Sequence, residues 1–156
     1  MPSRHRSRQR ALQVLFQIDI RQQSAAEALD GFYGSLITSE EAPVESEERD
    51  PFMERLVKST VERLSDIDRR VSGHSEHWRI ERMAAVDRNI LRLAVCEMTS
   101  TDTPAAVVID EALELARRFS SDESVAFING VLDAVHRSWT SGHEVTGPPG
   151  PAPKSQ

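Results

Sequence analysis

Apolar residues recur every three to four positions along most of the chain, which is the period of an amphipathic α-helix. The clearest case follows Ser24, where five large apolar side chains fall on one helical face: Leu29, Phe32, Tyr33, Leu36 and Ile37. Strand-like alternation is nearly absent. The pattern predicts about seven helices joined by short connections, an all-α fold in which the helices pack as two small bundles.

Capping residues mark where these helices are expected to begin. Ser24-Ala25-Ala26-Glu27 has the spacing of a capping box, and Asp50-Pro51 combines a favoured N-cap with proline at the first helical position. Further starts are predicted at Ser65-Asp66, at Thr103-Pro104 and at Ser121-Asp122, with another helix over 85–98.

The remaining segments set the predicted domain limits. Residues 38–50 are acidic and poor in large apolar groups, which predicts a loop. Residues 140–156 are rich in glycine and proline and too poor in apolar residues to offset the entropy of ordering, so we expect a disordered tail. Residues 1–139 are therefore predicted to form one domain.

Gly130 stands inside the last predicted helix, where glycine costs about 1 kcal/mol relative to alanine. A tight helix crossing is the simplest explanation. The alternative is a ligand that approaches the backbone at this point.

Composition excludes several classes of protein. No apolar run approaches the roughly 18–20 residues that span a bilayer, and the N-terminus lacks the apolar region of a secretory signal. The single cysteine, Cys96, rules out an internal disulfide framework and suits a reducing cytoplasm.

Charge is distributed unevenly. The formal net charge is −6, but residues 1–10 carry four arginines and no acid, so the rest holds 15 of the 19 cations against all 25 acids, or −10. This distribution indicates a local polyanion site at the N-terminus. A solubilising tail is the alternative. If the run is helical, it adds cations to the positive end of the helix dipole, which a bound phosphate backbone would offset. On a helical wheel, Arg4 and Arg8 lie toward the apolar face, whereas Arg6 and Arg10 point away from it.

The sequence contains no motif that indicates an active site. The histidines do not cluster with metal-ligand spacing, and no glycine-rich phosphate loop is present. Cys96 precedes Glu97, whose charge disfavours a reactive thiolate. We therefore expect no enzymatic activity, no metal and no cofactor.

Three segments, taken in order and spacing, resemble the NusB family of bacterial transcription antitermination factors. They are R-H-R-S-R-Q-R-A-L-Q-V-L-F (4–16), V-D-R-N-I-L-R-L-A-V-C-E (86–97), and P-A-A-V-V-I-D-E-A-L-E-L-A-R-R-F (104–119) followed by F-I-N-G-V-L-D (127–133). The resemblance covers about residues 4–138.

This resemblance implies a cytoplasmic adaptor made of two three-helix bundles. Its implied partners are the ribosomal protein NusE, boxA-type single-stranded RNA in ribosomal RNA leaders, and, through the complex, other Nus factors and RNA polymerase. The complex suppresses termination and assists ribosome assembly. A homodimer through the partner surface stays open. The alternatives are an RNA-binding module like that of rRNA cytosine methyltransferases and a helical interaction scaffold.

The resemblance also implies roles for individual positions. The RNA-binding set on the first helix is Arg4, His5, Arg6, Arg8, Arg10 and Gln13, with His5 in place of a frequent basic residue. The family's F-x-N-G adds Phe127 and Asn129, and Phe127 either stacks on a base or packs in the core. Phe16, Glu81 and Asp87 match the side that faces NusE.

Overall fold

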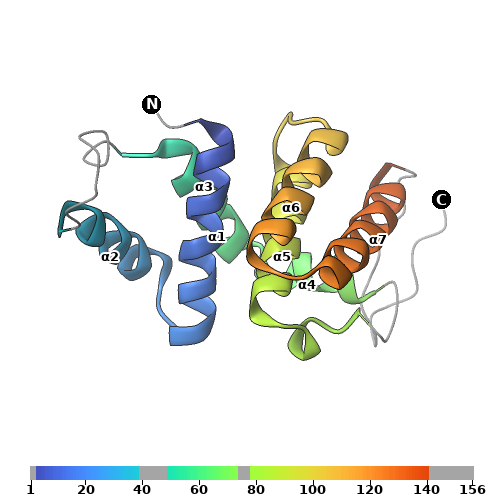
Figure 1. Ribbon diagram of the computed structural model, residues 1–156, viewed down its shortest axis with the longest axis horizontal. Helices are drawn as coiled ribbons and strands as arrows, with labels where there is room; N and C mark the ends of the chain where they lie inside the picture. Colours follow the sequence, from blue (N-terminus) through green and yellow to red (C-terminus); the bar gives the residue numbers. More distant parts are fainter. Residues whose placement is uncertain (1–2, 39–48, 74–77, 141–156) are drawn as a thin grey trace. The chain divides into compact units, whose positions relative to one another are not determined.

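The computed structural model describes residues 3–38, 49–73 and 78–140, and these residues form helices without any strand (Figure 1). The predicted all-α fold is confirmed. The elements are α1 Arg4–Arg21, α2 Ala25–Thr38, α3 Pro51–Glu62, α4 Leu64–Ser72, the 3-10 turn η3 Ile80–Arg82, α5 Ala85–Ser100, α6 Ala105–Phe119 and α7 Asp122–Thr140. The predicted tail after Thr140 and most of the predicted loop over 38–50 lie outside the described residues.

The chain divides into two compact units at Glu62 and Arg63. In the first unit, α1 packs against α3 and α2. Its core consists of Ala11, Leu12, Val14, Leu15, Ala28, Leu29, Phe32, Met53, Leu56 and Val57. Of the apolar face predicted after Ser24, Leu29 and Phe32 are buried and Tyr33 is half-buried, while the side chains of Leu36 and Ile37 lie outside the described ones.

In the second unit, α5 is the central helix and contacts α4, α6 and α7. All of its residues from Asn89 to Met98 are buried. Arg92 is tolerated in this interior because it donates two hydrogen bonds to Asp68 of α4, at 2.9 and 3.0 Å. A helix covered on all sides is expected to be mainly apolar, and α5 satisfies this with a few paired polar groups.

Three of the predicted helix starts have the expected caps. The Ser24 hydroxyl accepts from the Glu27 amide at 3.1 Å, while the Glu27 carboxylate accepts from the Ser24 amide at 3.3 Å. Asp50 accepts from the Met53 amide, and Ser121 accepts from the Ser124 amide. Each cap satisfies amides that a helix leaves unpaired at its N-terminus.

The short helix predicted from Ser65-Asp66 is present as α4, but the predicted cap is wrong. Only Arg63 separates α3 from α4, so the Arg63 carbonyl accepts from the Ile67 amide at 2.9 Å and opens the new helix. Ser65 consequently lies inside the first turn, and no side chain caps α4. Among the described residues, no helix is both long enough and apolar enough to cross a bilayer.

Candidate nucleic-acid interface

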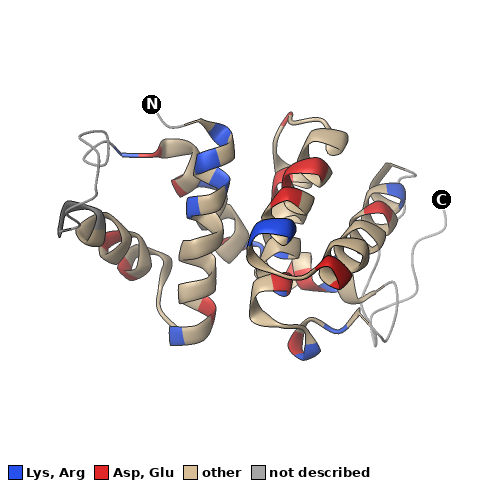
Figure 2. Cartoon of the chain, viewed as in Figure 1, with Lys and Arg blue, Asp and Glu red and all other residues tan. Residues whose placement is uncertain are grey.

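The arginine run is the beginning of α1 and not an extension before it. The helix starts at Arg4, and the Ser3 hydroxyl caps it by accepting from the Arg6 amide at 3.2 Å. Figure 2 shows basic residues gathered on these first turns. No acidic residue lies in the first turn, so positive charge accumulates where the helix dipole is already positive.

The arginines differ in exposure. Arg4 and Arg6 are exposed, as is His5 between them, whereas Arg8 and Arg10 are buried, with 5% and 8% of their surface accessible. The wheel placed Arg10 on the outward side, and this expectation is wrong. Because α2 and α3 both pack on α1, they cover more of its circumference than the apolar stripe alone indicates.

Asp50 is the buried counter-charge for this helix end. It is 1% exposed, and its carboxylate accepts from the Ser7 hydroxyl at 2.8 Å, from Arg10 Nη1 at 3.4 Å and from the Met53 amide at 3.1 Å. One side chain therefore caps α3 and anchors α1. The Arg10 guanidinium is thereby committed to the protein interior.

A second layer of hydrogen bonds extends from Asp50 to α2. Tyr33 Oη accepts from the Asp50 amide and donates to Glu54 Oε2, both at 2.9 Å. Arg49 donates to both Glu54 oxygens at 3.1 Å, and this hydrogen bond is the main reason that the pKa of Glu54 lies below its usual value. Burial is the main cause that raises the pKa of the Tyr33 hydroxyl. The network fixes all three helices of the first unit.

Phe52, in the first turn of α3, contacts two arginines of the run. The guanidinium carbon Cζ lies 4.6 Å from the ring centroid in Arg4 and 5.4 Å in Arg8. Both distances fall within the range of cation–π attraction. Sequence reasoning missed Phe52 because it lies 44 positions after Arg8 along the chain.

Farther along α1, Gln13 and Phe16 are exposed. Phe16 is 37% accessible, and Ile20, one turn later, is 55% accessible. The i, i+4 spacing puts both on the same side of the helix, a signal that was available in the sequence. An exposed apolar pair of this kind suits a protein contact.

Phe127 and Asn129 belong to α7 in the second unit. Phe127 is half-buried and Asn129 is exposed, with the buried Ile128 between them. Gly130 is exposed as well, and among the described residues a Cβ built on it would meet no atom within 4 Å beyond the backbone of its own helix. The predicted tight crossing is therefore wrong, since none of the described helices comes close enough to require a glycine here.

The two acidic residues assigned to the partner side differ in exposure. Glu81 is exposed on η3. Asp87 is nearly buried, and its two oxygens accept from the hydroxyls of Ser120 at 2.6 Å and Ser124 at 2.7 Å. Asp87 thus ties the start of α5 to the start of α7.

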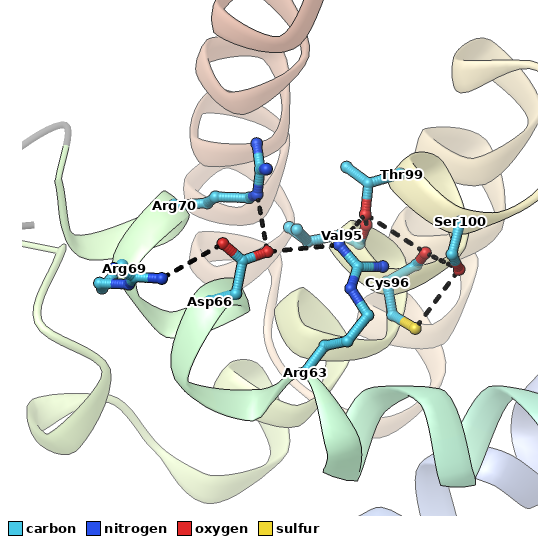
Figure 3. Close-up of polar contacts among 8 residues, drawn as sticks. All are labelled: Arg63, Asp66, Arg69, Arg70, Val95, Cys96, Thr99 and Ser100. Carbon is cyan, nitrogen blue, oxygen red and sulfur yellow. Dashed lines mark hydrogen bonds and ion pairs between the residues drawn. The ribbon is translucent and has the colours of Figure 1, made fainter. Parts of the chain in front are cut away.

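A cluster of arginines around Asp66 on α4 was not anticipated (Figure 3). Asp66 pairs with Arg63, Arg69 and Arg70 at 3.4, 3.5 and 3.1 Å, which leaves two positive charges in excess. Burial opposes ionisation of Asp66, but the hydrogen bond from Arg70 and the nearby guanidiniums outweigh it and lower the pKa. Arg70 also lies over the Trp139 ring of α7, with Cζ 4.9 Å from the centroid. The cluster joins the two helices.

No group of three metal-ligating side chains occurs in the part of the chain that the structure describes. The same part holds one cysteine, Cys96, which is buried. The arrangement offers cations and hydrogen-bond donors at the start of α1 and an apolar pair farther along that helix.

The chain matches known proteins over most of its length. The model of the NusB family matches residues 5–137. A transcription antitermination protein NusB of Solibacter usitatus is 61% identical over 137 residues, covering 88% of this chain and 90% of the relative. The Bacillus subtilis protein of the same name is 40% identical, with 85% and 93% covered.

Solved structures agree with the fold. A NusB structure from T. maritima has a TM-score of 0.72 at 32% identity and covers 87% of this chain and 92% of its own. A complex of the antitermination factors NusB and NusE with double-stranded RNA contains a chain with a TM-score of 0.72 at 24% identity, covering 88% and 99%. With the family model matched from residue 5 to residue 137, this chain belongs to the NusB family of transcription antitermination proteins.

Proposed function

We propose that this protein is an adaptor in transcription antitermination that binds boxA-type single-stranded RNA together with a NusE-type ribosomal protein. It acts in the cytoplasm, joins the other Nus factors on RNA polymerase, and promotes transcription of ribosomal RNA and ribosome assembly without catalysing a reaction. Family membership supports this function, as does the related NusB–NusE–RNA complex. The observation that carries it is the arginine-bearing start of α1 in an otherwise acidic chain.

The start of α1 suits a phosphate backbone for two reasons. Helix N-termini attract anions, because their amides and dipole are positive. Arginine adds charge-assisted hydrogen bonds to phosphate oxygens. Arg6 is the foremost phosphate contact in this proposal, since its side chain is exposed and none of the interactions found among the described residues engages its guanidinium. Arg4, His5 and Gln13 are further exposed side chains of the same helix.

The basic partner would contact apolar and acidic groups. Phe16 and Ile20 supply an exposed apolar pair on α1, and Glu81 supplies an exposed carboxylate on η3. Charge complementarity with a basic ribosomal protein would speed and orient encounter more than it would tighten binding. Asp87 would contribute indirectly, by holding the starts of α5 and α7 in place, because its oxygens already accept two hydroxyl hydrogen bonds.

The test is a fluorescence anisotropy titration of boxA-type RNA between 50 and 300 mM salt, with and without NusE. Each phosphate contact to single-stranded RNA contributes about 0.7 to the slope of log K against log salt concentration. We expect Arg6→Ala to weaken binding and flatten that slope by about 0.7.

Arg21→Ala is the matched control. Arg21 is exposed on the last turn of the same helix, 15 residues after Arg6, so the two lie roughly 22 Å apart along the axis at 1.5 Å per residue. This separation exceeds twice the Debye length of about 8–10 Å. Equal effects of the two substitutions would refute a site at the start of α1.

A further inference from the structure

We propose that Phe52 of α3 is a positioning residue for RNA binding: its ring holds the exposed Arg4 guanidinium where it meets the RNA backbone, and it also packs against the buried guanidinium of Arg8. This inference rests on the proposed function and adds a residue from another helix to the arginine run. The geometry that carries it is one aromatic ring with two arginines at 4.6 and 5.4 Å from its centroid.

Spacing along α1 explains how one ring serves two arginines. Arg4 and Arg8 are one helical turn apart, so their side chains project to the same side of α1. Phe52 is half-buried in the first turn of α3, and α3 packs along α1. The ring therefore lies beside two successive turns of the arginine-bearing helix.

The ring also offsets part of the repulsion between the positive charges at this helix end. Arg4, Arg6 and Arg8 crowd the positive end of the dipole, and the first turn contains no acid. The face of an aromatic ring carries negative potential and attracts a guanidinium. Cation–π attraction consumes no hydrogen-bond donor, so the ring itself does not occupy the N–H groups that phosphate oxygens require.

Phe52 is fixed in place by the Asp50 network. Asp50 lies two residues before it, caps α3 and accepts from Ser7 and Arg10 of α1. The ring is thus attached to the helix whose arginines it contacts. Arginine side chains lose much rotamer freedom when they are immobilised, and orienting them before binding lowers that cost at the moment of association.

The first experiment compares Phe52→Leu, Phe52→Tyr and wild type in the full-length chain, by anisotropy with boxA-type RNA at several salt concentrations. An exposed cation–π contact corresponds to about a two- to fivefold effect, so we expect Phe52→Leu to weaken binding by roughly that factor. The salt slope should stay unchanged, because no cation is removed. Phe52→Tyr keeps the ring and should restore binding to within about twofold.

Phe119→Leu is the matched control. Phe119 is an exposed aromatic on α6 of the second unit, with Arg118 Cζ 5.4 Å from its ring centroid. The control therefore removes the same kind of contact elsewhere, and its RNA affinity should equal that of wild type. An equal loss in both leucine variants would overturn the inference.

A double-mutant cycle separates positioning from direct contact with a base. In an Arg4→Ala background, Phe52→Leu should have no further effect on RNA binding, since the ring acts through the Arg4 guanidinium. An undiminished loss in that background would mean that the ring stacks on RNA itself, and the proposal would be wrong.

A measurement on the unmutated protein covers the case in which Phe52→Leu does not fold. In NMR spectra of the free wild-type chain, the side-chain protons of Arg4 and Arg8 should resonate upfield because of the Phe52 ring current, whereas those of Arg6 should not. Unshifted Arg4 and Arg8 resonances would overturn the inference.

RNA binding by the variants distinguishes a wrong role for Phe52 from a wrong proposed function. If Phe52→Leu binds like wild type while Arg6→Ala weakens binding, the role of Phe52 is refuted and the proposed function stands. If the wild-type chain binds no RNA with or without NusE, the proposed function fails and the role of Phe52 fails with it.

Discussion

Replacing Asp50 with alanine should destabilise the protein more than any surface substitution. Asp50 is 1% exposed and accepts hydrogen bonds from Ser7, Arg10 and the Met53 amide. Without its carboxylate, α3 loses its N-cap. A serine hydroxyl and a guanidinium also stay in a buried environment without the acceptor that they share.

The magnitude follows from these contacts. Loss of an N-cap costs about 1 kcal/mol. Breaking a buried ion pair by removing one partner costs about 3–5 kcal/mol, and the 3.4 Å distance between Arg10 and Asp50 favours the lower end. We therefore expect the free energy of unfolding to fall by about 4 kcal/mol, a large share of the roughly 5–15 kcal/mol typical of a folded protein.

Urea unfolding followed by far-UV circular dichroism at pH 7 measures this loss. Asp110→Ala is the control, because Asp110 is exposed on α6, and its effect should stay within about 0.5 kcal/mol. Adding Arg10→Met to Asp50→Ala removes the unpaired buried charge and should recover about 2 kcal/mol. A loss below about 1 kcal/mol, the value of the cap alone, would refute the reasoning. So would a double variant no more stable than Asp50→Ala.

Three further substitutions have expected outcomes. The pKa of Glu54 is lowered in the folded state, so wild type loses that part of its stability as pH falls from about 5 through the lowered pKa. Glu54→Gln should flatten the acid side of a plot of unfolding free energy against pH, and an unchanged plot would contradict this. Asp87→Ala removes the acceptor of two serine hydroxyls and should cost about 2 kcal/mol in urea unfolding; a cost no larger than that of Asp133→Ala, an exposed control, would count against it. Gly130→Ala should raise the unfolding free energy by about 0.5–1 kcal/mol, since the added Cβ meets open space, and a lower stability would disprove that account. If RNA approaches the Gly130 backbone, the same variant should also bind RNA more weakly.

Features that depend on neighbours in sequence could be predicted. The capping box at Ser24 needs only the residue three positions later, and the cap at Asp50 needs only the first turn of α3. Apolar spacing likewise identified Leu29 and Phe32 of α2 as buried positions, because the helical period decides which side chains share a face.

Features that depend on residues far apart in sequence could not be predicted. The burial of Arg10 depends on Asp50, 40 positions away, and the contact of Phe52 with Arg4 and Arg8 requires α3 to pack along α1. Gly130 was assigned to a helix crossing because sequence gives no measure of the space around a residue. Candidate RNA contacts could thus be named, whereas those committed to the interior could not be separated from those left exposed.

The exposed start of α1 is the proposed contact with the RNA backbone. The most direct measurement is the affinity of the full-length chain for boxA-type RNA at increasing salt, for wild type, Arg6→Glu and Arg21→Glu. If phosphates bind there, wild-type affinity should fall linearly on logarithmic axes, Arg6→Glu should bind more weakly with a slope flatter by at least about 0.7, and Arg21→Glu should resemble wild type. Equal binding by wild type and Arg6→Glu, or an affinity that does not change with salt, would contradict the proposed contact.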